Sequence, residues 1–140
     1  NQKDFFRSGV ISDFFLQKDP IFAKLNLDND EYKLYHQIYQ HLELKAPVPD
    51  LVIYLQTPVD LLRYRVEKRN IKYEQRITTE YLEKIAESYS NYFHYDHNSN
   101  VLIVNNQDLD ILEDTSALTM LIKRIEQISS IREYFNPRLI

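Results

Sequence analysis

The chain has 140 residues, and a chain of about that length buries roughly two thirds of the surface that it exposes when unfolded. Its 17 basic and 21 acidic residues give a net charge of −4, which excludes a general electrostatic grip on nucleic acid. The absence of cysteine excludes disulfides and thiolate metal sites. No apolar run approaches the roughly 20 residues of a membrane span, so we expect a soluble, cytoplasmic, single-domain protein over residues 1–140.

The beginning of the chain carries little pattern. A single glycine, Gly9, excludes a glycine-rich phosphate cradle within these residues. The chain starts with Asn1 rather than methionine, and its first ten residues give no clean domain start. We therefore expect natural sequence upstream. Val10 and Ile11 predict a short strand, which would end at the carboxylate of Asp13.

A helix is predicted from Asp28 to about Leu44. Asp28 and Glu31 have the spacing of a capping box, and apolar and aromatic residues then recur on one helical face. The residues at 51–55 are apolar throughout, as expected of a strand that is covered on both faces in a parallel sheet. Thr57 offers a cap and Pro58 suits the first position of the helix that should follow.

The second half of the chain continues this alternation. The polar residues 70–76 predict an exposed connection, and a long helix is expected over 79–93. Residues 101–104 predict a second buried strand, a loop follows it, and a final amphipathic helix is expected over 118–128. Strands that alternate with helices in this way indicate an α/β fold with a parallel sheet.

Polar side chains follow each predicted strand, where ligands of open α/β sheets bind. They are Asp13, then Gln56 and Thr57, and then residues 105–110. Asp13 has two open interpretations. It is either a partner for a metal or hydroxyl, or a helix cap or turn former.

Arg65 and Arg69 lie four residues apart, so a helix places both on one face beside the polar connection. Two guanidinium groups in that position suit phosphoryl oxygens. The alternative is a solvated helix face on which the arginines pair with Glu67 or other acids. The order of buried strand, capped helix, paired arginines and polar loop favours the phosphate-binding interpretation.

Four segments together resemble the bacterial deoxynucleoside kinases, the deoxyguanosine and deoxyadenosine kinases among them. The resemblance runs from Val10 to about Ile111, and the segments follow the order and the approximate spacing of the family. They are SDFFLQKDPIFAKLNL, PDLVIYLQTPVDLLRYRVEKR, YEQRITTEYLEKI and VLIVNNQDLDI.

The resemblance implies a P-loop kinase-like parallel sheet with flanking helices. It also implies transfer of the γ-phosphoryl group of ATP to the 5′-hydroxyl of a deoxynucleoside, with Mg²⁺, by a homodimer that prefers purines. Relatives carry the P-loop strand and the catalytic carboxylate before the point that matches Asn1. The resemblance therefore implies an incomplete sheet here and a 140-residue chain that does not catalyse by itself.

The resemblance also assigns residues to the substrate and the metal. Asp13 matches the acid of the acid-Arg-Ser motif, with a magnesium or 5′-hydroxyl contact, although Phe14 stands where that motif has arginine. Phe22 matches an aromatic residue that stacks on the nucleobase, and its alternative is a core phenylalanine. Lys18 lies near an acidic, base-facing position of the family and cannot take that role unchanged.

The lid of the family matches about residues 65–77, and Arg65 and Arg69 match two of its phosphate-binding arginines. The usual Arg-Gly-Arg run has become Arg69, Asn70 and Ile71, so a glycine and an arginine are replaced. Arg76 offers partial compensation, and Glu74 matches an acid that contacts the sugar 3′-hydroxyl.

Asn106, Gln107 and Asp110 match the loop that borders the adenine of ATP. Two other classes stay open: a binding or dimerisation module without turnover, and a relative of nucleoside-monophosphate kinases. His94 and His97 lie three residues apart without a third convincing ligand, so the pattern does not favour a metal site there.

Overall fold

The structure is a computed structural model that describes residues 9–13, 15–95, 99–107 and 115–136. The chain divides into two compact units, Asn1–Ala46 and Pro47–Ile140, here called unit 1 and unit 2. The expected single domain stays a prediction. Among the described residues, no helix combines the length and the apolar character that a membrane crossing requires.

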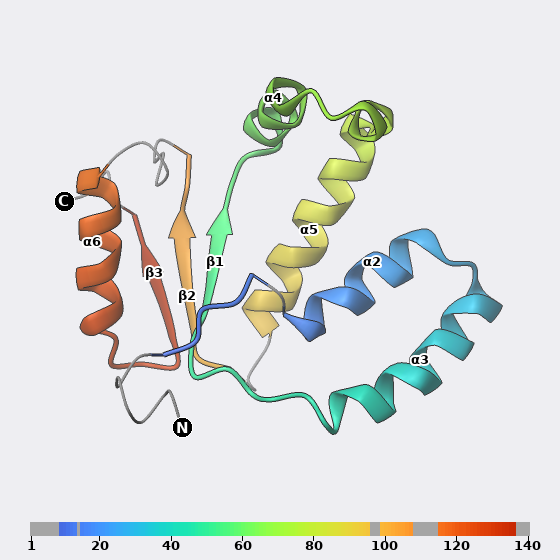
Figure 1. The fold of residues 1–140 in the computed structure, drawn as a ribbon, viewed down its shortest axis with the longest axis horizontal. Coiled ribbons are helices and arrows are strands. Elements are labelled where there is room, and N and C mark those ends of the chain that lie inside the picture. The colour runs from blue at the N-terminus through green and yellow to red at the C-terminus, as the bar shows by residue number, and fades with distance from the viewer. Residues whose placement is uncertain (1–8, 14, 96–98, 108–114, 137–140) are drawn as a thin grey trace. The chain divides into compact units, whose positions relative to one another are not determined.

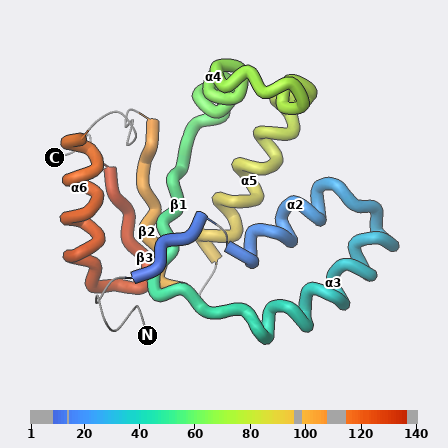
Figure 2. The backbone as a smooth tube through the Cα atoms, in the orientation of Figure 1, coloured from blue at the N-terminus to red at the C-terminus, as the bar shows by residue number. Residues whose placement is uncertain are grey.

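Unit 1 contains a short 3-10 helix, η1 (Leu16–Lys18), and the helices α2 (Asp19–Asn26) and α3 (Asn29–Glu43) (Figure 2). The predicted capping box of α3 is confirmed. The Glu31 backbone N–H donates to Asp28 Oδ1 at 2.8 Å, and the Asp28 N–H donates to Glu31 Oε1 at 3.0 Å. This reciprocal pair satisfies two donors that would otherwise lack partners at the first turn.

A side-chain bond joins α2 to α3. The Tyr35 hydroxyl donates to Asp19 Oδ2 at 2.5 Å. Burial, and then this bond to a carboxylate, raise the pKa of Tyr35 because both disfavour a phenolate. Tyr39 on α3 is also buried, so aromatic side chains supply much of the packing of this helix.

The strand predicted at Val10 and Ile11 is wrong. These residues are not part of any strand, and their side chains are 72% and 100% exposed. A strand is held by hydrogen bonds to a neighbour and by burial of one face, and these two residues have little burial. Local β preference is therefore not enough, and Asp13 lies in a bend instead of at a strand end.

Unit 2 is built on a parallel sheet of three strands among the described residues: β1 (Val52–Gln56), β2 (Val101–Asn105) and β3 (Arg132–Phe135). The order is β1-β2-β3, and both pairs are parallel. The sequence predicted the first two strands. It did not predict β3, because this strand carries Arg132 and Glu133 and has no apolar run.

Helices connect these strands. The predicted helices are confirmed, and the polar connection contains a 3-10 helix. They are α4 (Val59–Arg69), η2 (Lys72–Arg76), α5 (Thr79–Tyr95) and α6 (Thr115–Glu126). The predicted cap of α4 is wrong, because Pro58 takes the N-cap position and no side chain caps this helix. The Thr57 hydroxyl donates to the Leu55 carbonyl at 3.4 Å instead.

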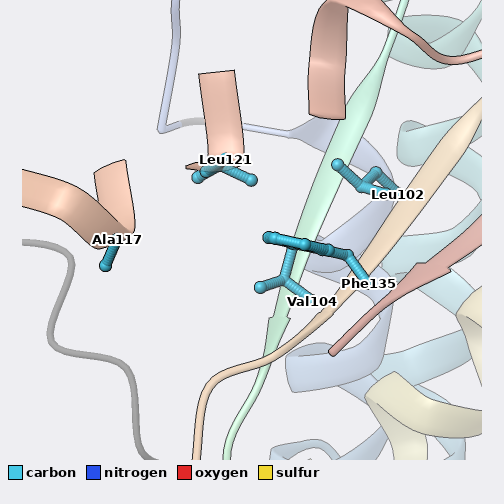
Figure 3. Close-up of a cluster of buried hydrophobic side chains, with 5 residues drawn as sticks. All are labelled: Leu102, Val104, Ala117, Leu121 and Phe135. Atoms are coloured by element: carbon cyan, nitrogen blue, oxygen red, sulfur yellow. The ribbon is translucent and has the colours of Figure 1, made fainter. Parts of the chain in front are cut away.

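The two faces of the sheet pack against different helices of unit 2, α6 on one and α5 on the other (Figure 1). Leu102, Val104 and Phe135 form a buried cluster with Ala117 and Leu121 of α6 (Figure 3). On the opposite face, the Tyr54 ring stacks on Phe93 of α5 with 4.7 Å between centroids. Covering on both faces explains why the apolar run of β2 is almost fully buried.

The prediction that the first strand is covered on both faces is only half right. Val52 is buried, but Ile53 and Leu55 are 39% and 44% exposed. These two side chains share a face with Leu102 and Val104, and β1 is at the edge of the described sheet. The buried part of that face lies over β2 and β3, where α6 packs.

Candidate active site

The carboxyl ends of β1 and β2 meet at one edge of the sheet, because Gln56 lies opposite Asn105 in the parallel register. Here the chain leaves β1 through Thr57 and Pro58 into α4, and leaves β2 through Asn106 and Gln107. This is the position at which ligands bind in open α/β folds. The structure therefore places two of the predicted polar segments side by side.

Asn106 is buried at this edge, with only 6% of its surface exposed. Its backbone N–H donates to the Gln56 carbonyl at 2.9 Å, and its side-chain Nδ2 donates to Thr57 Oγ1 at 3.2 Å. A buried polar side chain is costly to place unless it is hydrogen-bonded. Asn106 therefore ties the end of β2 to the turn that begins α4.

The neighbouring residues of this loop are more open. Gln107 is exposed, and its backbone N–H donates to Asn105 Oδ1 at 3.1 Å, which holds the start of the loop in a turn. Asp110, the third residue predicted to border ATP, lies outside the described residues.

The helix α4 carries both predicted lid arginines. Arg65 is partly buried, and Arg69, the last residue of the helix, has a side chain that is 59% exposed. Their spacing of four residues places them on the same face of the helix, as predicted. The basic face of this helix therefore ends next to the connection formed by η2.

Sequence reasoning did not identify Arg63. Its Nε donates to Glu67 Oε1 at 3.1 Å, and its Nη1 donates to the Ile77 carbonyl. The second bond joins α4 to Ile77, the residue that follows η2, so Arg63 links the helix to the far end of the predicted lid segment. The i, i+4 spacing of Arg63 and Glu67 was visible in the sequence, but the contact with Ile77 depends on how the chain turns between them.

Asn70 ends α4 in the left-handed conformation, with φ 52° and ψ 38°. It is the only residue with positive φ among those the structure describes. Glycine is the usual residue for this conformation, and asparagine is one of the few others that tolerate it. The structure thus gives a physical reason why asparagine can stand at the position where the resemblance implies glycine.

Arg69 and Glu74 lie together within the segment that the sequence predicts as a lid, about residues 65–77. Arg69 Nη2 donates to Glu74 Oε2 at 2.6 Å, and the Glu74 side chain is only 12% exposed. The other carboxylate oxygen, Oε1, is buried without a hydrogen-bond partner. A buried oxygen of a carboxylate is a strong acceptor. An unpaired carboxylate oxygen of Glu74 therefore lies close to the guanidinium group of Arg69, a group that suits phosphate.

Asp13 and Phe22 belong to unit 1, and so are described apart from the lid. Asp13 is exposed in its bend, and its backbone carbonyl accepts a bond from Lys18 Nζ at 2.9 Å. Phe22 lies on α2 and is partly buried, and its carbonyl accepts a bond from Asn26 Nδ2 at 2.7 Å. Their predicted roles stay predictions.

Metal-binding groups are sparse in the described part of the chain, which contains no cluster of three or more acidic, histidine or cysteine side chains. Mg²⁺ at phosphoryl-transfer sites is held by one or two carboxylates together with phosphates and water. Asp13 offers one exposed carboxylate, and its role as a magnesium ligand stays a prediction. His94 Nδ1 lies 3.0 Å from the Tyr134 hydroxyl, and His97 falls outside the described residues.

A comparison with sequence models of protein families decides to which family the chain belongs. The model described as "Deoxynucleoside kinase" matches residues 1–130. The chain belongs to the deoxynucleoside kinase family. Its curated relatives include a deoxyguanosine kinase of Bacillus subtilis, 35% identical over 80 residues, which are 57% of this chain and 39% of the relative.

A deoxyadenosine/deoxycytidine kinase of the same organism is 26% identical over 137 residues, covering 91% of this chain and 63% of the relative. The chain thus spans less than two thirds of the length of each of these two kinases.

Solved structures agree with this family assignment. The deoxyadenosine kinase of M. mycoides with bound dCTP is 25% identical, with a TM-score of 0.68 over 79% of this chain and 60% of that one. The same enzyme with bound dATP gives a TM-score of 0.71 at 24% identity, over 90% and 68% of the two chains. The fold of this family member is therefore P-loop kinase-like, a parallel sheet with flanking helices, as predicted.

Proposed function

We propose that the whole protein is a deoxynucleoside kinase that transfers the γ-phosphoryl group of ATP to the 5′-hydroxyl of a deoxynucleoside, in the cytoplasm. One observation carries the proposal. In this member of the family, a helix at the carboxyl edge of the parallel sheet carries Arg65 and Arg69, and it ends beside the partly unsatisfied carboxylate of Glu74. Cations and an acceptor in one short segment suit a substrate that carries both phosphate and hydroxyl groups.

Arg65 and Arg69 are proposed to bind the transferring phosphoryl group. Phosphoryl transfer depends on positioning and on stabilising the charge of the phosphoryl oxygens, with little covalent work for the protein. Two guanidinium groups on one helix face place positive charge where that charge develops. Mg²⁺, when bound, supplies further neutralisation of the phosphates, and the proposed protein ligand for it is Asp13.

Glu74 is proposed to accept a hydrogen bond from the sugar 3′-hydroxyl through Oε1, the oxygen without a partner. Its second oxygen remains paired with Arg69. One carboxylate then orients the sugar and also holds the arginine that meets the phosphate. Binding of the sugar would therefore fix the geometry of the phosphate-binding group, which favours catalysis through positioning.

The remaining roles follow the family resemblance. Phe22 is proposed to stack on the nucleobase, and Asp13 to contact either Mg²⁺ or the 5′-hydroxyl. Gln107 and Asp110 are proposed to border the adenine of ATP. We assign Asn106 a different role, because its side chain is buried and donates to Thr57.

A purine deoxynucleoside is the proposed acceptor. Two of the curated relatives are a deoxyguanosine kinase and a deoxyadenosine/deoxycytidine kinase. The 140-residue chain by itself is proposed to be inactive. The whole protein is proposed to form a homodimer, as the family resemblance implies.

The direct test is phosphoryl transfer from labelled ATP to each of the four deoxynucleosides by the full-length protein. We expect transfer to deoxyguanosine or deoxyadenosine. Arg69→Ala should lower kcat/KM about 100-fold, as expected for removal of one group that stabilises transition-state charge. The matched control is Lys68→Ala, which removes an exposed positive charge from the neighbouring position of α4. An equal effect of both variants, or no transfer to any nucleoside, would refute the proposal.

A further inference from the structure

Asn106 was predicted to contact ATP, but its hydrogen bonds lie beside the amino-terminal end of α4, the helix that carries Arg65 and Arg69. Among the described residues, only Ser99 and Asn106 are buried polar residues. Ser99 lies before β2 and Asn106 directly after it, where the predicted catalytic edge lies. Burial of an amide side chain at that edge costs free energy, which hydrogen bonds must compensate.

Two hydrogen bonds connect Asn106 to the end of β1, and a third continues from Thr57. The Asn106 N–H extends the β-ladder by donating to the Gln56 carbonyl, and Nδ2 donates to the Thr57 hydroxyl. That hydroxyl in turn donates to the Leu55 carbonyl. We call this set the Asn106 bridge. Successive bonds in a partly buried site reinforce one another, so the bridge fixes the direction in which the chain leaves β1.

The helix α4 begins two residues beyond Thr57 and has no side-chain cap of its own. Its first turn contains a bond from the Leu62 N–H to the Pro58 carbonyl, at 3.0 Å. Pro58 has a restricted φ, so the orientation of Thr57 is passed on to the helix with little freedom. The helix is therefore directed at its start by the strand edge and along its length by α5 and η2.

The lid arginines lie far along this helix from its base. At 1.5 Å per residue, Arg65 and Arg69 are about 9 and 15 Å from Val59. A tilt of about 10° at the base would move a group about 15 Å away by roughly 2.5 Å. Displacements of about 1 Å at a catalytic group can cost about 100-fold in rate. A small change at Thr57 is thus amplified at the phosphate-binding groups.

We infer that Asn106 is a positioning residue, which acts through Thr57 to aim α4 and its two arginines, and that it does not contact the nucleotide. This inference rests on the proposed kinase function. It adds a residue outside the lid to the set that determines the rate of phosphoryl transfer.

The test combines three variants and a matched control. Asn106→Ala removes the side-chain donor, Thr57→Val removes its acceptor at nearly constant shape, and Thr57→Ser retains the hydroxyl. Asn100→Ala is the control, because Asn100 Nδ2 donates to the Asp50 carbonyl at 3.3 Å at the opposite, amino end of the same two strands. Both asparagines therefore join the strands, but only one lies beside α4.

The first readout is amide hydrogen exchange in the 140-residue chain. Loss of one net hydrogen bond of about 1 kcal/mol should speed exchange of the Leu62 amide about fivefold in Asn106→Ala and in Thr57→Val. Thr57→Ser and Asn100→Ala should leave it unchanged. Slow exchange at Leu102 and Val104 shows that the sheet itself remains folded. Unchanged exchange at Leu62 in a folded Asn106→Ala variant would overturn the inference.

The second readout is the steady-state kinetics of the full-length protein. We expect Asn106→Ala and Thr57→Val to lower kcat about tenfold, with KM for ATP within about twofold of wild type, and the double variant to be no worse than either one. A higher KM for ATP in Asn106→Ala alone would show a nucleotide contact and overturn the inference. Absence of transfer in the wild-type protein would instead refute the proposed function, and the exchange result would still decide the bridge.

Discussion

The core of unit 2 and the segment predicted as its lid, about residues 65–77, are held together by different forces. Leu102, Val104 and Phe135 lie in a contiguous apolar cluster against α6. The lid has the ion pair between Arg69 and Glu74 and a left-handed asparagine at its turn. Apolar packing contributes energy in proportion to buried area, whereas an ion pair with one exposed partner, here Arg69, is partly screened by water. The core therefore specifies the fold, and the lid keeps polar groups that a ligand can engage.

The largest expected effect comes from the core. Leu102→Ala should lower the free energy of unfolding by about 3 kcal/mol, because Leu102 is fully buried and truncation leaves a cavity. Urea denaturation of the chain measures this value. Leu118→Ala on α6 is the control, since Leu118 is 40% exposed, and it should cost about 1 kcal/mol or less. Equal costs at the two sites would contradict the assigned core.

A lid substitution should separate activity from stability. In the full-length protein, Glu74→Gln should raise KM for the deoxynucleoside about tenfold, because an amide is a weaker partner for both Arg69 and the sugar hydroxyl. The unfolding free energy should change by about 1 kcal/mol or less, since the Arg69 side chain is 59% exposed. Glu67→Gln, which alters the pair with Arg63, serves as the control. A large loss of stability with unchanged KM would assign Glu74 to the fold instead.

Asn70 tests the turn that ends α4. Asn70→Ala should destabilise the chain by about 1 kcal/mol, because alanine has a Cβ atom and no side-chain hydrogen bonding to favour the left-handed conformation. Asn70→Gly should be neutral or slightly stabilising. Thermal unfolding of both variants measures the difference. If alanine and glycine behave alike, the left-handed turn at this position is wrong.

The smallest expected effect is a pH dependence at the end of the sheet. N–H groups of Ser129 and Ser130, and then Arg124, hold the pKa of Glu133 below its ordinary value of 4.5. A lowered folded pKa contributes stability that is present above the ordinary value and lost as the pH falls through the folded value. Glu133→Gln should therefore lose less stability than wild type on acidification below about pH 4.5. Parallel stability curves would contradict this.

The candidate site was only partly predictable from the sequence. The spacing of Arg65 and Arg69 predicted a shared helix face because helix periodicity is a local property. Pairing of Arg69 with an acid was one of the two interpretations, but Glu74 was not predicted as the partner, since that contact depends on the left-handed turn at Asn70. Asn106 was predicted to border ATP, but burial, which no local pattern reveals for a polar residue, points to a structural link with Thr57.

By itself, the sequence determined the elements that depend on local chemistry: the capping box of α3, the helices α4, α5 and α6, and the apolar strands β1 and β2. Only the tertiary structure decided that Val10 and Ile11 form no strand and that Arg132–Phe135 does. It also decided which side of β1 is covered. The physical reason is that a strand exists through its neighbours, whereas a helix satisfies its own backbone hydrogen bonds.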